Sequence, residues 1–473
     1  MLVLQLLLLT QTVATAQDEP SPYDPRFGIV NSYLNTEEAS AAGAGWTRVF
    51  FRWDVVQPGG PSDWKPTNVP DPLIEAELEA GREIVAVLIG TPTWATEQGT
   101  STAVPPLDLW GEFVFKIANQ YQGRISHWVI WNRPDITDPT STNYTWAGTE
   151  LDYYNLLREA YLKIKSVDPA MQVHIAGLTY TWDSDRGQPQ YLSRLLDTIL
   201  LDPAAANENY YFDAVDYHLY YSPQLILESV TDVRRILDER GLTDKSIWVS
   251  ETNAPPSQDF IEPAQGTPPF QITLEEQSAF VVQAFSLALA GGAERVAFNQ
   301  LRNKPNAPVL NGLLRSDNSR RPAFNAYQAV TTHFAETQST TWQQIGTVTL
   351  VTLNRGGQTT TVLWNNATTP TTFSLGAIAP EALLIDPLGN TQVIGPSNGA
   401  YSIVLPAAIC SNGANCFIGG MPRLLVEAGS PEQRAAVTQP TAPATPEVAA
   451  ATPSPTPPLS TATPTNTPAP VAP

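Results

Sequence analysis

The sequence predicts an α/β protein whose main part is a (β/α)8 TIM barrel. Eight short apolar segments between residues 27 and 335 alternate with amphipathic segments. The apolar segments lack the polar alternation of a half-exposed sheet, which indicates parallel strands covered by helices. Eight β/α units in about 310 residues fit one closed barrel, and a doubly wound open sheet is the alternative.

The expected strands are rich in β-branched and aromatic residues. In chain order they are residues 27–33, 46–53, 83–90, 126–132, 172–178, 212–220, 246–251 and 295–300. Gly or Pro stop signals close three of the helices expected between them, at 108–122, 149–167 and 223–240. A further helix begins after Thr273, which forms a capping box with Glu276, and ends at Gly291 and Gly292. The barrel domain is therefore expected to span residues 17–335.

After His333 the sequence changes to short, turn-rich segments of β-branched residues. This pattern predicts a small antiparallel, sandwich-like β domain over residues 340–428. The domain holds both cysteines of the chain, Cys410 and Cys416. In an exported protein we expect this pair to form a disulfide that closes one small loop.

Both ends of the chain differ from the part that is expected to fold. Residues 1–16 form an apolar block that ends in small residues, which predicts a signal peptide cleaved before Gln17 and a secreted, extracellular protein. Residues 437–473 are dominated by Pro, Thr, Ala and Ser, a composition typical of a disordered, extended stalk. We expect such a stalk to act as a spacer that holds the folded part of the protein away from a cell surface.

The charge balance excludes one class of partner. Of the 473 residues, 46 are Asp or Glu and 26 are Lys or Arg, so the formal net charge is −20. We therefore expect no binding to nucleic acid.

After residue 16, no apolar segment reaches the length of a transmembrane helix. Phosphate-binding GxxxxGK[ST] and dinucleotide-binding GxGxxG loops are also absent from the sequence.

Polar and aromatic residues gather where the expected strands end, which is where barrel enzymes place their chemistry. These positions carry Arg52, Trp94, Trp131, Asn132, Arg133, His218, Tyr220 and Glu251. Such a mouth suits a carbohydrate, because aromatic rings stack on the C–H faces of a sugar while its hydroxyls need hydrogen bonds. The sugar, the linkage, the choice between endo and exo action, and the oligomeric state stay open at this level.

Several of these segments resemble clan A of the glycoside hydrolases, and most nearly the family 39-like group of β-xylosidase and endoglycosidase type. The resemblance covers most of residues 27–335. It is carried by Arg52 and by the segments PTW at 92–94, IWNRPD at 130–135, DYHLY at 216–220, WVSETN at 248–253 and GLLRSDNSRRPAFNAY at 312–327. The resemblance implies retaining hydrolysis of O-glycosidic bonds in oligosaccharides or polysaccharides. It makes Glu251 the nucleophile, Arg52 its partner and Asn132 a contact to the sugar 2-hydroxyl, with no metal and no cofactor.

One position departs from the family pattern. The family motif on strand four is Trp-Asn-Glu-Pro, in which the Glu is the general acid/base, but this chain has Arg133 there. An arginine with a pKa above about 12 neither releases nor accepts a proton at neutral pH. We therefore expect either an impaired glycosidase or a pseudoenzyme that binds carbohydrate without cleaving it. The nearest carboxylates that could replace the lost acid are Asp135, Asp138 and Asp183, although they lie off the expected strand end.

The candidate binding residues also have structural alternatives. Trp94 and Trp131 could pack within the barrel, and so could His218 and Tyr220. Arg52 could form a buried ion pair with a purely structural role. The sequence alone leaves these alternatives open.

Overall fold

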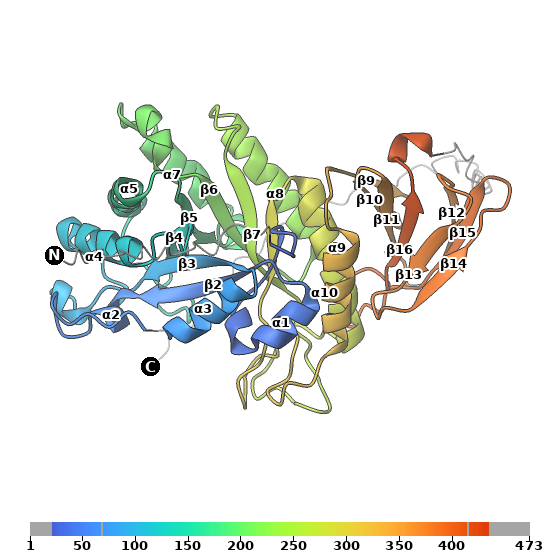
Figure 1. Ribbon diagram of the computed structural model, residues 1–473, viewed down its shortest axis with the longest axis horizontal. Coiled ribbons are helices and arrows are strands. Elements are labelled where there is room, and N and C mark those ends of the chain that lie inside the picture. The colour runs from blue at the N-terminus through green and yellow to red at the C-terminus, as the bar shows by residue number, and fades with distance from the viewer. Residues whose placement is uncertain (1–20, 68–69, 414–415, 435–473) are drawn as a thin grey trace, which may run out of the picture.

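The computed structural model describes residues 21–67, 70–413 and 416–434. They form a barrel followed by a β domain (Figure 1). The expected signal peptide at 1–16 and the expected stalk at 437–473 lie outside the described residues. Within the described ranges, no helix combines the length and apolar character needed to cross a membrane.

The barrel is a closed ring of eight parallel strands in sequence order. Strand β1 (Phe27–Ile29) pairs on one side with β2 (Trp46–Arg52) and on the other with β8 (Arg295–Phe298). The strands between them are β3 (Glu83–Ile89), β4 (His127–Asn132), β5 (Gln172–Leu178), β6 (Ala214–Tyr220) and β7 (Ser246–Asn253). The predicted barrel is confirmed, and the open sheet is excluded because β8 closes onto β1.

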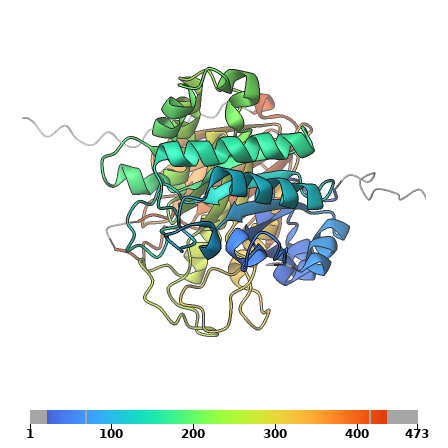
Figure 2. The same ribbon diagram turned by 90° about the vertical axis from the view of Figure 1, so that its left-hand side faces the viewer.

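Helices cover the outside of the barrel, as the amphipathic segments predict. The longer ones are α1 (Thr36–Ala42), α3 (Asp71–Glu79), α4 (Leu107–Gln120), α5 (Glu150–Val167), α7 (Tyr191–Ile199), α8 (Pro223–Asp238), α9 (Leu274–Gly291) and α10 (Pro322–His333). The short ones are α2 (Trp53–Val56), α6 (Tyr180–Ser184), η1 (Ser32–Leu34), η2 (Thr93–Ala95) and η3 (Ala205–Tyr211). Helices α4 and α5 lie side by side across the strands (Figure 2).

The β domain contains two antiparallel sheets. The larger has the strand order β14-β13-β16-β11-β10-β9, and the smaller pairs β12 with β15. Their bounds are β9 (Ser339–Ile345), β10 (Val348–Asn354), β11 (Gln358–Asn365), β12 (Thr371–Gly376), β13 (Ala382–Ile385), β14 (Thr391–Ile394), β15 (Ala400–Leu405) and β16 (Arg423–Ala428). Leu350 and Leu363 of the larger sheet share a buried core with Tyr401 and Ile403 of the smaller one. The predicted antiparallel β domain is therefore confirmed.

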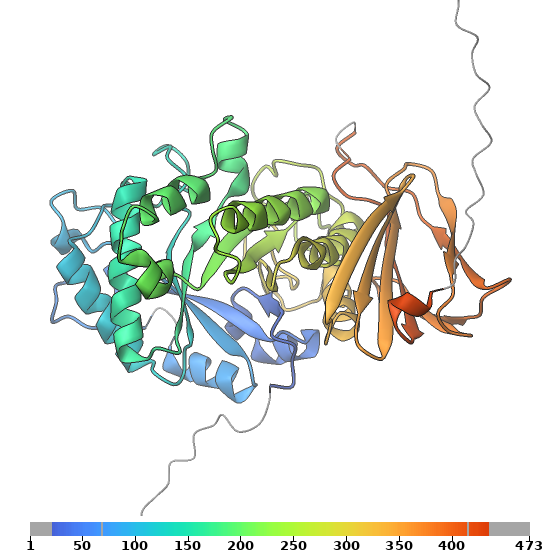
Figure 3. The same cartoon turned by 90° about the horizontal axis from the view of Figure 1, so that it is seen from above.

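Helix α9 lies between the barrel and the β domain (Figure 3). Its N-terminus has the predicted capping box, in which Thr273 and Glu276 hydrogen-bond reciprocally. The side-chain amide of Gln283 donates to the carbonyls of Gly419 at 3.1 Å and Gly420 at 3.0 Å, and its oxygen accepts from the Gly419 amide at 3.0 Å. Every residue of α9 from 276 to 289 is buried, because the barrel covers one side and the β domain the other.

A chain of buried titratable groups crosses the strands below the barrel mouth. His127 Nδ1 lies 3.0 Å from His174 Nε2, and His174 Nδ1 lies 2.9 Å from Asp216 Oδ1. His127 Nε2 lies 3.4 Å from a carboxylate oxygen of Glu83. Burial lowers the pKa of His127 to about 4, so its imidazole is neutral at pH 7.

This buried histidine makes the fold sensitive to acid. An unfolded histidine binds a proton near pH 6.5, whereas folded His127 does so only near pH 4. Protons therefore favour the unfolded chain across that interval, and the contribution of His127 is fully present above about pH 6.5 and lost as the pH falls to about 4. We expect His127→Gln to reduce the dependence of the urea midpoint on pH between 7 and 4. Parallel curves for the two proteins would contradict this assignment.

Candidate active site

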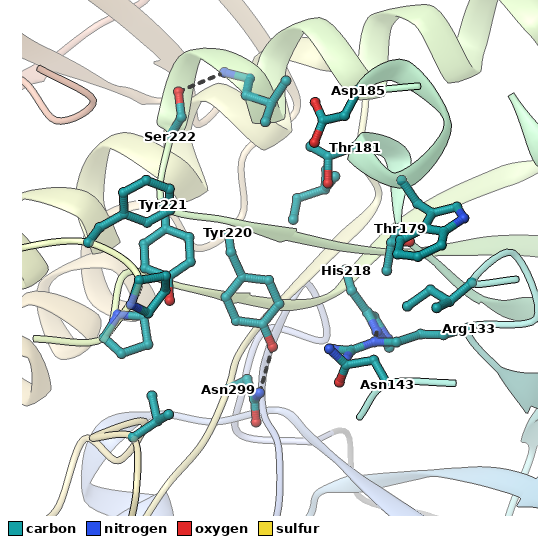
Figure 4. Close-up of a pocket in the computed structure, with 18 of the residues that line it drawn as sticks. Arg133, Asn143, Thr179, Thr181, Asp185, His218, Tyr220, Tyr221, Ser222 and Asn299 are labelled. Atoms are coloured by element: carbon teal, nitrogen blue, oxygen red, sulfur yellow. Dashed lines mark hydrogen bonds between the residues drawn. The ribbon is translucent and has the colours of Figure 1, made fainter. Parts of the chain in front are cut away.

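A pocket of about 810 Å³ opens where the barrel strands end. Its lining includes Arg133 after β4, His218 and Tyr220 at the end of β6, and Asn299 after β8. The carboxyl ends of parallel strands meet at one rim, so residues far apart in the sequence converge there. Figure 4 shows these four side chains around the same space.

Glu251 on β7 is not part of the pocket lining but contacts the lining residues Arg133 and Tyr220, and it is 6% exposed. Its Oε1 accepts a hydrogen bond from Arg48. Its Oε2 accepts from Tyr220 Oη at 2.5 Å, from Arg133 Nη2 at 2.9 Å and from Asn299 Nδ2 at 3.4 Å. Two guanidinium groups, a phenol and an amide therefore surround one carboxylate, and both of its oxygens are engaged.

His218 stands between the two arginines. Its Nδ1 accepts from Arg133 Nε at 3.0 Å, and its Nε2 lies 2.8 Å from Arg48 Nη1. Burial, together with the charges of Arg133 and Arg48, lowers the pKa of His218 well below its ordinary value. The neutral ring has one lone pair and one N–H, so it accepts from one arginine at a time. Gly177 of β5 leaves room for this ring, because a Cβ there would lie 2.1 Å from His218 Nε2.

Arg133 is held over Glu251 by several contacts. Its backbone has φ of 50°, in the left-handed region, and its amide donates to the Gly177 carbonyl at 2.9 Å. Besides its bonds to His218 and Glu251, its guanidinium donates through Nη1 to Asn143 Oδ1 at 2.7 Å. The side chain therefore points into the site and not into solvent.

The contact to Glu251 that the resemblance implies for Arg52 is made by Arg48. Both arginines lie on the same side of β2, because residues an even number apart share a face of a strand. Arg52 lies at the strand end and pairs instead with Asp54, at 3.1 Å from Nε to Oδ1 and 2.7 Å from Nη2 to Oδ2. Burial lowers the pKa of Arg48 to about 10, so it stays charged at neutral pH. A second arginine inside an otherwise apolar strand was the sequence signal for Arg48.

Three other predicted binding residues lie away from the pocket lining. Trp131 is completely buried and donates through Nε1 to the Thr145 carbonyl at 3.0 Å. Trp94 donates through Nε1 to the Gln57 carbonyl at 2.6 Å and is not part of the pocket lining. The carbonyl of Asn132 accepts from the Thr145 hydroxyl, and Asn132 does not line the pocket. Trp131 is therefore packed inside the barrel and Trp94 is partly buried, whereas His218 and Tyr220 line the pocket.

The three proposed replacement carboxylates also lie outside the pocket lining. Asp135 is buried and accepts from the amide and hydroxyl of Thr179 at 2.7 and 2.6 Å, and burial raises its pKa to about 6. Asp183 is buried and Asp138 is exposed. Among the described residues, the lining contains one carboxylate, that of Asp185, which follows α6 and which the sequence analysis missed.

The described part of the chain contains no group of three or more His, Cys, Asp or Glu side chains placed to hold a metal ion. The polar side chains of the pocket lining are those of Arg, Asn, Ser, Thr, Tyr and His, together with the carboxylate of Asp185. Such groups can bind the hydroxyls of a sugar.

No family model and no curated protein sequence matches the chain. Among solved structures, a family 39 glycoside hydrolase from Bacteroides cellulosilyticus WH2 matches with a TM-score of 0.64 and 18% identity, covering 85% of this chain and 81% of that one. A monomeric β-xylosidase from Caulobacter crescentus CB15 gives 0.57 and 14%, covering 87% and 97%. A family 30 xylanase from Clostridium acetobutylicum gives 0.57 and 13%, covering 86% and 97%. The chain therefore shares its fold with glycoside hydrolases.

Proposed function

We propose that this is a secreted, glycosidase-like protein that binds carbohydrate at the barrel mouth and whose hydrolysis of O-glycosidic bonds is impaired. The observation that carries the proposal is the 2.9 Å contact between Arg133 Nη2 and Glu251 Oε2. Export rests on the sequence of residues 1–16, and the Pro/Thr-rich residues 437–473 would act as a spacer at the cell surface.

Retaining hydrolysis needs two carboxyl groups about 5 to 5.5 Å apart, one as nucleophile and one as acid/base. Glu251 occupies the position that the resemblance gives to the nucleophile, and Arg133 occupies that of the acid/base. Arg133 cannot protonate a departing oxygen or activate water. Its guanidinium also holds Oε2 of Glu251 in a charge-assisted hydrogen bond, which lowers the electron density available for attack.

Sugar binding depends less on the missing carboxyl group. Tyr220 Oη donates to Glu251 and accepts from Asn299 Nδ2 at 2.6 Å, so the two side chains form a fixed polar surface. Thr179 and Thr181 add hydroxyls on another side of the pocket. These groups are placed to hydrogen-bond a polyhydroxylated ligand whether or not its glycosidic bond is cleaved.

The second candidate is a carbohydrate-binding protein with no hydrolytic activity. It is favoured by the four donors around Glu251, namely Arg48, Arg133, Tyr220 and Asn299. Three of these donors engage Oε2 and one engages Oε1, and each bond draws electron density from the carboxylate and weakens it as a nucleophile.

Dinitrophenyl glycosides distinguish the two candidates, because their leaving group needs little protonation. If Glu251 is a competent nucleophile, we expect one equivalent of dinitrophenol to be released and a long-lived sugar adduct to appear on the Glu251 peptide by mass spectrometry. Glu251→Gln should abolish the adduct, and unactivated oligosaccharides should stay intact. Sugar binding without an adduct would select the binding protein. Rapid turnover of unactivated oligosaccharide that survives Glu251→Gln would contradict both candidates.

A further inference from the structure

The pocket has two unlike sides. Its polar end consists of Arg133, Asn143, His218, Tyr220 and Asn299. Its apolar wall consists of Tyr221, Pro255, Pro269, Phe270, Val309 and Phe417. Figure 4 shows Tyr221 on one side of Tyr220, and Arg133 with Asn143 on the other. A ligand that fills the pocket therefore meets charged and amide groups at one end and mainly aromatic and proline side chains at the other, where Tyr221 and Ser222 carry hydroxyls.

Three aromatic rings form a continuous row in the apolar wall. The ring centroids of Tyr221 and Phe270 are 4.7 Å apart, and those of Phe270 and Phe417 are 5.0 Å apart, both in edge-to-face geometry. Tyr221 follows β6 and Phe270 precedes α9, so both belong to the barrel. Phe417 belongs to the β domain, between β15 and β16. The β domain therefore supplies part of the pocket.

The disulfide loop of the β domain holds this row in place. Cys410 and Cys416 are joined, and Phe417 follows the second cysteine directly. Within the loop, the side-chain amide of Asn412 accepts from the Gln271 amide at 2.8 Å and donates to the Gln271 carbonyl at 2.9 Å. Because Gln271 is the neighbour of Phe270, one covalently closed loop fixes two of the three rings.

The apolar wall offers ring faces but few hydrogen-bond partners, so it suits a hydrocarbon group better than a second sugar, whose C–H faces could stack on the rings but whose hydroxyls would find few partners. Hydroxyls placed against phenylalanine and proline side chains lose their water without gaining partners, which is unfavourable. The hydroxyl of Ser222 on this side accepts from the Leu225 amide at 3.2 Å as a helix N-cap, which leaves one O–H donor among the phenylalanine and proline side chains. An aromatic group in the same place gains free energy from the area it buries and from edge-to-face contacts.

We propose that the pocket takes glycosides with an apolar, aryl-sized aglycone, with the sugar at the polar end and the aglycone against the apolar wall. This inference rests on the proposed function and names the class of ligand for the same site. It does not depend on cleavage, because the apolar wall acts on binding.

The test compares phenyl and methyl glycosides of xylose, glucose, galactose and arabinose by calorimetry. We expect the phenyl form of the preferred sugar to bind at least about tenfold more tightly than the methyl form, because the phenyl group is buried. Phe270→Ala and Phe417→Ala should remove most of that ratio, because they weaken binding of the phenyl glycoside more than binding of the methyl glycoside. Phe260→Ala is the matched control, since Phe260 precedes α9 in the same loop but is 96% exposed and lies outside the pocket lining.

Two further variants distinguish loss of the ring contacts from loss of folding and test the role of the disulfide loop. Phe270→Leu keeps an apolar side chain and should retain part of the ratio, and Cys410→Ser with Cys416→Ser should lower it by freeing the loop. Equal affinity for the phenyl and methyl forms, or tighter binding of a disaccharide than of the phenyl glycoside, would overturn the inference while leaving carbohydrate binding in place. A folded protein that binds none of these glycosides would overturn the proposed function itself.

Discussion

Replacing Arg133 with Glu is expected to raise the rate of oligosaccharide hydrolysis by about 10²- to 10⁴-fold, the usual contribution of general acid/base catalysis. The new carboxyl group would lie near Glu251, and repulsion between two neighbouring carboxylates would raise the pKa of one of them. One group could then donate a proton while the other attacks. Removal of the guanidinium also frees Oε2 of Glu251, while Arg48 still holds Oε1.

The control for this variant is Arg133→Gln, which removes the positive charge without adding an acid. We expect it to speed the reaction of dinitrophenyl glycosides, since Glu251 is freed, but to leave unactivated oligosaccharides intact. The measurement is the release of reducing sugar for the oligosaccharides and of dinitrophenol for the activated substrates. Equal oligosaccharide rates for the Glu and Gln variants would show that the missing acid/base is not what limits hydrolysis.

Glu251→Ala is expected to lower the free energy of unfolding by about 3–5 kcal/mol, because it leaves the buried charge of Arg48 without its ion-pair partner. Arg48 is 2% exposed, and its bond to Glu251 is an ion pair. The substitution therefore leaves a charged guanidinium buried in the barrel without that carboxylate. Arg133 loses the same partner. A catalytic carboxylate that is present only for chemistry would not have this effect on stability.

Asp54→Ala provides the matched control, since Asp54 also pairs with an arginine of β2 but near the surface. We expect that substitution to cost no more than about 1 kcal/mol, as for other exposed ion pairs. Urea unfolding of both variants at pH 7 makes the comparison. A Glu251→Ala protein that unfolds at the urea concentration of the unsubstituted protein would contradict the structural role of this carboxylate.

The fold could be predicted from the sequence because its signals are local. The strand segments are apolar on both faces, and the capping box at Thr273 and Glu276 marks the start of α9 within four residues. The candidate nucleophile and His218 could be found in the same way, since the first ends a predicted strand, the second lies near the end of another, and both lie at the observed site.

The placements of Arg48, Trp131 and Phe417 could not be predicted, because they depend on contacts between distant segments. Arg48 and Arg52 share one face of β2, and only the position of Glu251 across the barrel decides which of them it meets. Trp131 has a positive φ of 72°, which places its ring among buried aromatic residues, and no residue pattern indicates this. Phe417 reaches the pocket from another domain, so a search limited to barrel strand ends could not include it.

The burial of α9 on all sides limits how this architecture can be rearranged. A helix that is covered all round belongs to the interior of a larger unit, and here that unit includes both the barrel and the β domain. Gene fusions and deletions that separate the two parts after α10 would expose an apolar stripe and leave Gln283 without its three hydrogen bonds to Gly419 and Gly420. Shuffling of this barrel among multidomain proteins should therefore carry the β domain with it, as one heritable module.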